Sequence, residues 1–412
     1  MRVVLFDDER ARDWMPFALT RPIGELLFGA YTFRERAARL FGSCAGHVSA
    51  EELAGFEEPG AAPLIARDDA AASAPTLYLS ARAVIDWNVR FDPGRPGVVR
   101  VGGVVVGCFL TTGSPPAEFF ERPTEFQMAT DDVRGARGYD LPGVVLENVW
   151  DLIALNDKQI AKDFEATRSR AASPKLPAGV HVIGEAEGGI RLAANVTIEP
   201  GVVLDVSSGP IWLEDNVTVR AFSRVQGPVF VAKDSTLLGG PYTAVSIGPV
   251  CKIHGEIEES IVLGYSNKAH DGFLGHAYLG RWVNLGALTT NSDLKNNYGT
   301  IRLWTPRGDT DTGQIKIGCL LGDHVKTGIG VMLNTGTVVG AGSNIFGAGQ
   351  PPKYVPPFQW GSGDSLVDYD LDRFLHTAKT VMARRKIALG EGQVSLLRRA
   401  WQRARTMSGA ST

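Results

Sequence analysis

Residues 211–238 read IWLEDNVTVRAFSRVQGPVFVAKDSTLL, and this stretch decides the fold of the second half of the chain. An aliphatic side chain recurs at every sixth position: Leu213, Val219, Val225, Val231 and Leu237. A six-residue period fits neither a helix, with its period of about 3.6, nor the simple alternation of a strand. It is typical of a coil with three short flat sides per turn, each side pointing one aliphatic residue inward. The pattern therefore predicts a parallel β-helix.

The same step continues on both sides of this stretch. Gly, Asn and Asp, which tolerate left-handed backbone geometry, stand at the expected corners between the aliphatic positions. We expect coils over residues 180–350, stacked as a solenoid because each coil buries its face only against its neighbours. A β-sandwich with coincidental spacing is the alternative. The further six-step series are Ile315, Leu321, Thr327, Leu333, Val339 and Ile345, together with Ile198/Leu204, Ile247/Ile253 and Leu279/Leu285.

The repeat is interrupted over residues 264–278 and again over residues 288–314. Insertions in a solenoid form loops on one face, usually the functional face, so we expect the working site there. Residues 351–412 are expected to form a helical extension, because apolar and basic residues alternate at helical spacing after Tyr369.

Residues 1–167 have the pattern of a mixed α/β domain. The opening MRVVLF predicts a strand, and YTFRERAARLFG predicts an amphipathic helix that ends at Gly42. Residues 150–164 have helical periodicity, and the polar, Pro-containing residues 168–179 are the predicted linker. A chain of 412 residues is too long for one compact core, which agrees with two domains.

Composition excludes several classes of protein. A formal net charge of −3 gives no electrostatic case for binding nucleic acid or an anionic membrane. No apolar run approaches the roughly 18 residues that span a bilayer, and the acidic start after MRVVLF is unlike a signal peptide. The four cysteines are scattered without a CxxC pair, so we expect reduced thiols and a cytoplasmic protein.

The segment SNKAHDGFLGHAYLGRWVNLGALTTN, residues 266–291, carries a family motif. It resembles the bifunctional glucosamine-1-phosphate acetyltransferase/N-acetylglucosamine-1-phosphate uridylyltransferase family. In that family K-A-x-H-x-x-Y-L-G precedes N-x-G-A-G-T at a fixed interval, which His270 and Asn284 match. Phe273 stands where the family has Tyr, and one residue is missing between Lys268 and His270.

The resemblance implies an acyl-transfer site on the β-helix, with acetyl-CoA as the co-substrate. An imidazole near its ordinary pKa suits the removal of a proton from a sugar amine, so His270 is the candidate base. A structural role for His270 stays open, and His276 is the reserve candidate. The implied site comprises the catalytic candidates His270, Asn284 and Lys316 and the substrate-binding candidates Lys268, Phe273, Lys295, Asn297 and Tyr298.

The N-terminal segment VVLFDDERARDWMPFALTRPIGELLFGAYTFRER, with WDLIALNDKQIAKDF further on, resembles a divergent branch of sugar-nucleotidyltransferase domains fused to such β-helices. The resemblance implies an α/β, Rossmann-like domain followed by a left-handed parallel β-helix with terminal helices. Nucleotidyl transfer needs charge neutralised on phosphate, usually with Mg²⁺. The nucleotide-binding candidates are Asp8, Arg21 and Gly24, and the metal candidates are Asp7 and Asn156.

A structural role is the alternative for these residues, with Asp7 capping a turn and Arg21 paired with a carboxylate. The usual glycine-rich G-x-G-T-R-M loop is absent and an acidic DDER stands in its place.

Three functions remain open. The first is a bifunctional enzyme that joins nucleoside triphosphate to sugar 1-phosphate and acylates an amino-sugar phosphate from acyl-CoA, in the route to UDP-GlcNAc. The second is a nucleotidyltransferase alone, uridylyl- or thymidylyl-, with a trimerising β-helix. The third is a non-catalytic scaffold that binds sugar nucleotides. The resemblance also implies a homotrimer, because straight solenoids pack their flat sides around a three-fold axis.

Overall fold

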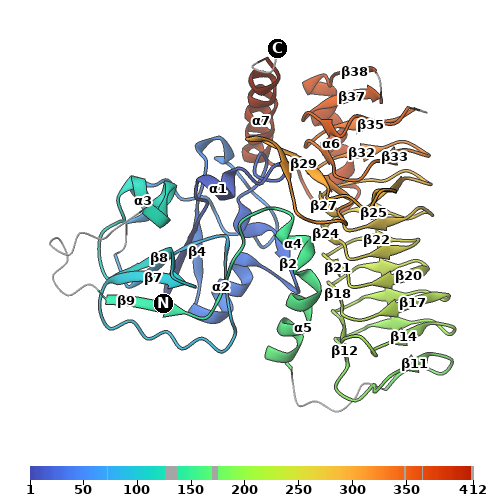
Figure 1. Cartoon of the computed structure of the whole chain (residues 1–412), viewed down its shortest axis with the longest axis horizontal. Helices are drawn as coiled ribbons and strands as arrows, with labels where there is room; N and C mark the ends of the chain where they lie inside the picture. Colours follow the sequence, from blue (N-terminus) through green and yellow to red (C-terminus); the bar gives the residue numbers. More distant parts are fainter. Residues whose placement is uncertain (72, 126–136, 169–174, 348, 364, 410–412) are drawn as a thin grey trace.

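A computed structural model describes the chain except residues 72, 126–136, 169–174, 348, 364 and 410–412. It contains two bodies side by side, an α/β domain and a β-helix, as predicted (Figure 1). The predicted linker at 168–179 lies partly outside the described residues. No helix in the described part of the chain is long and apolar enough to cross a membrane.

In its described residues, the N-terminal domain is built on one six-stranded sheet. Strand β1 (Arg2–Phe6) is the second strand of the sheet, parallel to the edge strand β4 (Cys44–Val48) on one side and to β5 (Thr76–Ser80) on the other. Its alternate side chains face two different cores, because successive residues of a strand point to opposite faces. The order continues from β5 through β8 (Val104–Leu110) and β7 (Gly97–Val101) to β9 (Arg137–Leu141).

Helices cover both faces of this sheet. Helix α2 (Phe33–Phe41) packs Ala37 and Phe41 against Val3 and Leu5. It begins at a capping box between Thr32 and Glu35, and it ends, as predicted, at Gly42, where φ is 121°. On the opposite face, α3 (Ala117–Glu121) packs two phenylalanines against Val4 and Phe6.

Smaller elements complete this domain. The helix predicted over residues 150–164 is two helices, α4 (Asp151–Ala154) and α5 (Asn156–Ala166), with a break at Leu155. Two short antiparallel pairs and the first helix are further parts of the domain. They are β2 (Leu27–Phe28) with β3 (Tyr31–Thr32), β6 (Ala83–Ile85) with β10 (Gly143–Val145), and α1 (Glu9–Arg12).

The β-helix has three parallel sheets, which we call the first, central and third sheets. The first contains β11 (His181–Ile183), β14 (Val203–Asp205), β17 (Ser223–Gln226), β20 (Gly240–Thr243), β23 (Ile257–Glu258) and β26 (Leu274–Gly275), followed by β28 (Thr290–Asn291) and β33 (Met332–Leu333). The central sheet contains β12 (Ile190–Leu192), β15 (Ile211–Leu213), β18 (Val229–Val231), β21 (Ser246–Ile247), β24 (Ile261–Gly264), β27 (Tyr278–Arg281), β31 (Cys319–Leu321), β34 (Thr337–Val339) and β36 (Tyr354–Val355). The third contains β13 (Thr197–Ile198), β16 (Thr218–Val219), β19 (Thr236–Leu237), β22 (Lys252–Ile253) and β25 (Asn267–Lys268). It continues through Asn284 to β32 (Lys326–Thr327), β35 (Asn344–Ile345), β37 (Gln359–Ser362) and the antiparallel β38 (Ser365–Asp368).

The six-step residues fill the interior of the coils. All five aliphatic residues from Leu213 to Leu237 are fully buried in one core. Asn195, Asn216 and Asp234 occupy left-handed corners with φ near 60°, as the composition predicted. Ile315 is the exception, because its side chain is 52% exposed and precedes the strand rather than belonging to it.

The predicted interruption at 264–278 is wrong. Strands β25 and β26 lie in it and pair in register with the coil below. The sixth-residue rule fails there because coil length varies: 17 residues separate Val262 from its neighbour Leu279, against 18 between Leu213 and Val231. In addition, Lys268 takes an interior position that an aliphatic residue holds elsewhere.

The second interruption is a true insertion. It contains an antiparallel hairpin, β29 (Arg302–Thr305) and β30 (Gly308–Asp311), outside the coil. Ile301 and Leu303 are buried against the central sheet, and the Trp304 ring stacks on Tyr354 with 3.6 Å between centroids. The tip of the hairpin reaches the N-terminal domain, where Arg307 pairs with Asp13 at 2.5 Å.

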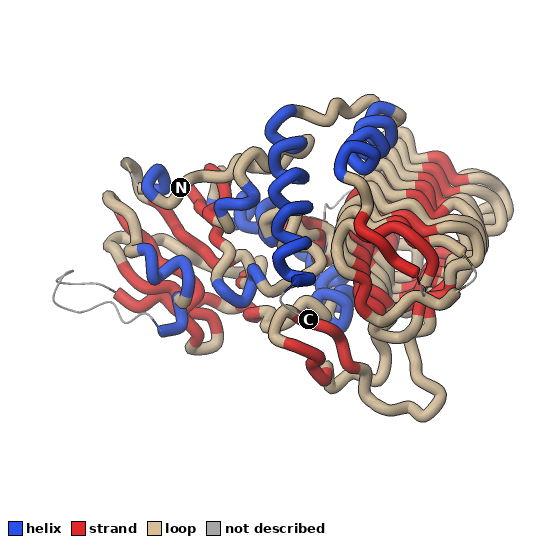
Figure 2. The backbone as a smooth tube through the Cα atoms, turned by 90° about the horizontal axis from the view of Figure 1, so that it is seen from above, coloured by secondary structure: helices blue, strands red, loops and turns tan. Residues whose placement is uncertain are grey.

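After the coils the chain returns to the N-terminal domain. Strands β36 and β37 extend the coil past residue 350, and α6 (Leu371–Ala383) lies beside the upper coils. Helix α7 (Glu391–Gly409) then stands between the two bodies (Figure 2). It contacts the N-terminal domain through Gln393, which accepts a hydrogen bond from the Glu57 backbone.

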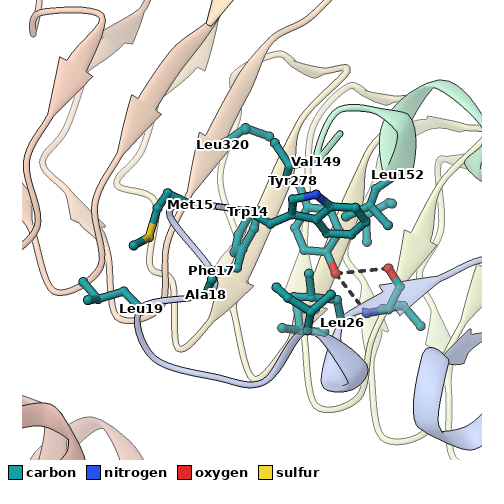
Figure 3. Packing of buried hydrophobic residues seen from close by; sticks show 14 of the residues in the cluster. Trp14, Met15, Phe17, Ala18, Leu19, Leu26, Val149, Leu152, Tyr278 and Leu320 are labelled. Carbon is teal, nitrogen blue, oxygen red and sulfur yellow. Dashed lines mark hydrogen bonds between the residues drawn. The ribbon is translucent and has the colours of Figure 1, made fainter. Parts of the chain in front are cut away.

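The two domains share a hydrophobic core. The outer face of the central sheet packs against the segment after α1, with Phe17 4.6 Å from Tyr278 between ring centroids (Figure 3). The hydroxyl of Tyr278 donates to the Leu27 carbonyl at 3.0 Å and accepts from the Leu27 amide at 2.9 Å. The domain boundary is therefore packed like a protein interior.

Candidate functional site

Asp7 and Asp8 follow β1 at the carboxyl end of the sheet, where open α/β sheets bind ligands. Asp8 caps α1 by accepting from Ala11 and forms a buried ion pair with Arg82 at 2.9 Å. The capping role that the sequence left open for Asp7 is therefore filled by its neighbour. Asp7 is also buried; it accepts from Ser49, and burial raises its pKa to about 6.

Arg21 lies at the domain boundary instead of an open phosphate site. Its fully buried guanidinium is held by Glu58 at 2.7 Å and by Asp323 of the β-helix at 2.8 Å. Thr20 donates to the same Asp323 carboxylate at 2.7 Å, and Arg281 lies 3.1 Å from Glu58. Burial lowers the pKa of Arg21, but the two carboxylates outweigh burial and raise it. Arg21 is therefore paired with carboxylates, which is the structural role given above as the alternative to nucleotide binding.

Gly24 and Asn156 also serve packing. A Cβ at Gly24 would lie 2.5 Å from the imidazole of His47, so this position has no room for a side chain. Asn156 accepts from the Gly29 amide at 2.9 Å and lies 3.1 Å from the Ser246 hydroxyl of the β-helix. The structure therefore gives Asp7, Asp8, Arg21 and Asn156 four separate sets of partners.

The predicted metal ligands do not fit an ion in this arrangement. Asp7 and Asn156 face different partners, and the described residues contain no group of three or more His, Cys, Asp and Glu side chains able to hold a metal.

A cavity of about 410 Å³ opens beside Asp8. The sequence predicted Asp8 as a nucleotide-binding residue, but it did not predict the other residues that line this cavity. Its ion pairs join Arg122 to Glu9 at 2.8 Å and Arg10 to Glu147. Arg307, at the tip of the β-helix hairpin, also lines it, so both domains contribute. The charged lining residues are Asp8, Glu9, Arg10, Arg82, Glu121, Arg122, Glu125, Glu147 and Arg307.

The β-helix separates the predicted residues of the acyl-transfer motif. His270 lies at an exposed corner, and its imidazole makes no hydrogen bond or ion pair within the described part of the chain. Lys268 points into the coil, where its amine donates to the carbonyls of His254 and His270. Burial lowers the pKa of Lys268 to about 8. Lys268 is thus part of the interior rather than open to a ligand.

His276, the reserve candidate, has the more organised surroundings. Its imidazole lies 2.8 Å from Asp293 and 3.0 Å from Glu259. Burial lowers its pKa, but the two carboxylates outweigh burial and raise it to about 9. Lys316 lies beside this cluster, 3.7 Å from Glu258. The Phe273 ring and the Asp293 carboxylate both lie against Gly275.

Asn284 and the inserted loop lie elsewhere. Asn284 accepts from Asn267 at 3.1 Å on the outer face of the third sheet. Lys295 and Asn297 bond within their own loop, to the carbonyl of Thr300 and the amide of Gly299. Tyr298 is 69% exposed and open to a ligand.

Comparison with known proteins agrees with the two-part architecture. Residues 3–171 match the model of a family described as sugar nucleotidyl transferase, which confirms the predicted resemblance of the N-terminal domain.

Among individual proteins, the chain is similar to the bifunctional protein GlmU of Synechococcus elongatus, with 27% identity over 231 residues, 50% of this chain and 46% of that protein. It is 30% identical over 188 residues to GlmU of Paraburkholderia xenovorans, covering 38% and 40% of the two chains. It is 25% identical over 177 residues to the bifunctional sugar-1-phosphate nucleotidylyltransferase/acetyltransferase of Sulfurisphaera tokodaii, covering 36% and 43%. The chain spans less than half the length of each of these relatives.

Proposed function

We propose that this protein is a sugar-1-phosphate nucleotidyltransferase whose β-helix carries an acyltransferase-like site. The family match over residues 3–171 supports the first activity most directly. The cavity beside Asp8 supports it too, because it lies at the carboxyl end of β1 and its lining combines four arginines, which can bind phosphate, with five carboxylates, some of which can bind Mg²⁺ together with phosphates. UDP-GlcNAc as the product, a homotrimer and a cytoplasmic location are further parts of the proposal.

The arginines of the cavity suit the binding of a triphosphate. Arg10 and Arg122 are each paired with a glutamate at about half exposure, and such surface pairs are weak. Phosphate oxygens can replace those carboxylates as acceptors and form stronger, bidentate bonds to guanidinium groups. Mg²⁺ would arrive with the triphosphate, because this ion is usually held by one or two carboxylates together with substrate phosphates.

The acyl-transfer activity depends on a histidine that can accept a proton. His276 is paired with two carboxylates and is therefore protonated near neutral pH, which suits donation of a proton rather than removal. His270 is exposed, so its imidazole is accessible to a substrate, and it remains our candidate. Acetyl-CoA is the proposed acyl donor. The lone, unoriented His270 also favours the second candidate function, nucleotidyl transfer alone with a structural β-helix.

Two assays on the purified chain decide between these functions. UTP or dTTP with a sugar 1-phosphate and Mg²⁺ should release pyrophosphate under both candidates. Acetyl-CoA with glucosamine 1-phosphate should release free thiol only if the β-helix is active. Pyrophosphate without thiol establishes the second candidate, and neither product across several sugars establishes the non-catalytic scaffold.

A further inference from the structure

A row of polar side chains follows the outer face of the third sheet. Lys252 pairs in register with Asn267, Asn267 with Asn284, and Asn284 with Lys326, one residue from each successive coil. Because parallel coils stack these positions directly above one another, the four side chains form a continuous line. Asn267 and Asn284 are bonded to each other, which fixes both carboxamides.

The end of α6 lies across this row and encloses a groove of about 520 Å³. The upper part of α6 is anchored to the coil by Phe374, whose ring lies 5.0 Å from Phe358 and 5.8 Å from His324. The anchor brings the last turn of the helix and the residues after it over the sheet. The helix-side lining is Thr377, Val381, Arg384 and Arg385.

An aromatic ladder forms the corner beside the groove. Tyr265 and Trp282 occupy the same left-handed corner in successive coils, with φ of 54° and 63° and 4.5 Å between ring centroids. Trp282 stacks in turn on His324. Both faces of the Trp282 ring are therefore covered. The ladder forms one side of the groove, and Trp282 has no free face on which a nucleobase could stack.

The charge of the groove is uniformly positive. Four basic side chains line it, Lys252, Lys326, Arg384 and Arg385, and no carboxylate is among the lining residues. Within the described residues none of the four forms an ion pair, whereas the arginines of the N-terminal cavity do. Arg384 at the end of α6 offsets the helix dipole, but that role does not account for the two lysines on the sheet.

We propose that this groove binds a phosphate ester, with Lys252, Arg384 and Arg385 neutralising phosphate oxygens and the fixed Asn267–Asn284 pair donating its free amide hydrogens. Cations gathered from a sheet and a helix without acidic partners are the arrangement that recognises phosphate. Lys326 lies beside these three cations. Burial lowers its pKa to about 7, and its amine donates to two backbone carbonyls, so its charge changes near neutral pH. The groove shares Asn284 with the proposed acyl-transfer site, so the inference rests in part on that proposed function, but it shares no residue with the nucleotidyl-transfer cavity.

Lysine footprinting of the full chain tests this site directly. An amine-reactive reagent labels exposed lysines, and peptide mass spectrometry measures the labelling of Lys252 with increasing inorganic pyrophosphate. We expect Lys252 to be protected while Lys379, which lies on α6 outside the groove lining, is labelled as before. The same ionic strength supplied as sodium chloride should protect neither. Equal labelling of Lys252 with and without pyrophosphate would overturn the proposal.

Substitution on α6 provides the matched control. R384Q together with R385Q should raise the pyrophosphate concentration that half-protects Lys252 by about tenfold, because two charge-assisted hydrogen bonds are lost. K379Q removes one charge from the same helix and should leave that concentration unchanged. Equal shifts in both variants would overturn the proposal by showing non-specific attraction. Circular dichroism of each variant checks that the helices are retained.

Further arms identify the source of the phosphate. Protection of Lys252 is measured with a nucleoside triphosphate, a sugar 1-phosphate and coenzyme A, and the strongest protection identifies the natural class. Because the readout is at Lys252, binding in the N-terminal cavity does not affect it. If pyrophosphate is released but Lys252 is never protected, phosphate binding in the groove is wrong and the proposed nucleotidyl transfer stands. If Lys252 is protected but no pyrophosphate is released, the groove stands and the proposed nucleotidyl transfer is wrong.

Discussion

The guanidinium of Arg21 lies 2.8 Å from the carboxylate of Asp323, although 302 residues separate them in the chain. The bond joins the loop after α1 to a coil of the β-helix, and both side chains are almost completely buried. The L-T-R-P motif of the N-terminal domain is therefore an element of domain docking. This contact ties the segment after α1 directly to the β-helix.

Removing one partner of this buried network should destabilise the whole chain. We expect D323A to lower the free energy of unfolding by about 3–5 kcal/mol, because the Arg21 charge is left buried with only Glu58. Urea unfolding measures it. The matched control is D368A, which breaks a half-exposed pair with Arg405 and should cost about 1 kcal/mol or less. Similar losses in the two variants would contradict a special role for the buried network.

The sequence predicted the interior of the β-helix because its period is local. Each coil repeats the same inward position, so Leu213 to Leu237 could be placed without knowing any distant contact. The prediction failed around Lys268, where the coil is shorter and the inward residue is a lysine whose amine is satisfied by carbonyls. A rule based on aliphatic spacing could not detect that exchange.

The sites were harder to predict because they depend on contacts distant in sequence. Arg307 reaches the N-terminal cavity only because the inserted hairpin folds toward the other domain, and nothing in the local pattern gives that direction. The three-residue capping spacing from Asp8 to Ala11 was a local signal that could have found the cap. The carboxylate partners of Arg21 had no such signal.

Arg307 should contribute to nucleotide binding in the N-terminal cavity. We expect R307A to raise the KM for the nucleoside triphosphate by about tenfold, the effect of losing one charged contact to phosphate. In its pair with Asp13 the Arg307 side chain is 55% exposed and that of Asp13 is 31% exposed, so stability should change by less than about 1 kcal/mol. The control R302A removes a charge from the same hairpin away from the cavity. A normal KM in R307A would remove Arg307 from the site.

His276 should make stability depend on pH in the alkaline range. Folding raises its pKa from 6.5 to about 9, so its contribution is complete below pH 6.5 and is lost as pH rises through about 9. We expect the difference in unfolding free energy between wild type and H276Q to shrink by on the order of 2–3 kcal/mol across that interval. Urea unfolding at pH 6 and at pH 9.5 measures it. A difference that is constant with pH would show that folding does not raise the pKa of His276.

The last prediction separates the two histidines of the acyl-transfer motif. If exposed His270 is the base, H270A should reduce thiol release from acetyl-CoA by about 100-fold or more, the usual contribution of general-base catalysis, while pyrophosphate release and stability stay unchanged. H276Q should lower stability at neutral pH, because Asp293 and Glu259 lose their cationic partner, but should retain thiol release in the folded fraction. The opposite result, full thiol release in H270A and none in folded H276Q, would assign the proton transfer to the carboxylate-flanked imidazole. In that case the reaction must use its protonated form, and activity should fall as pH rises above about 9.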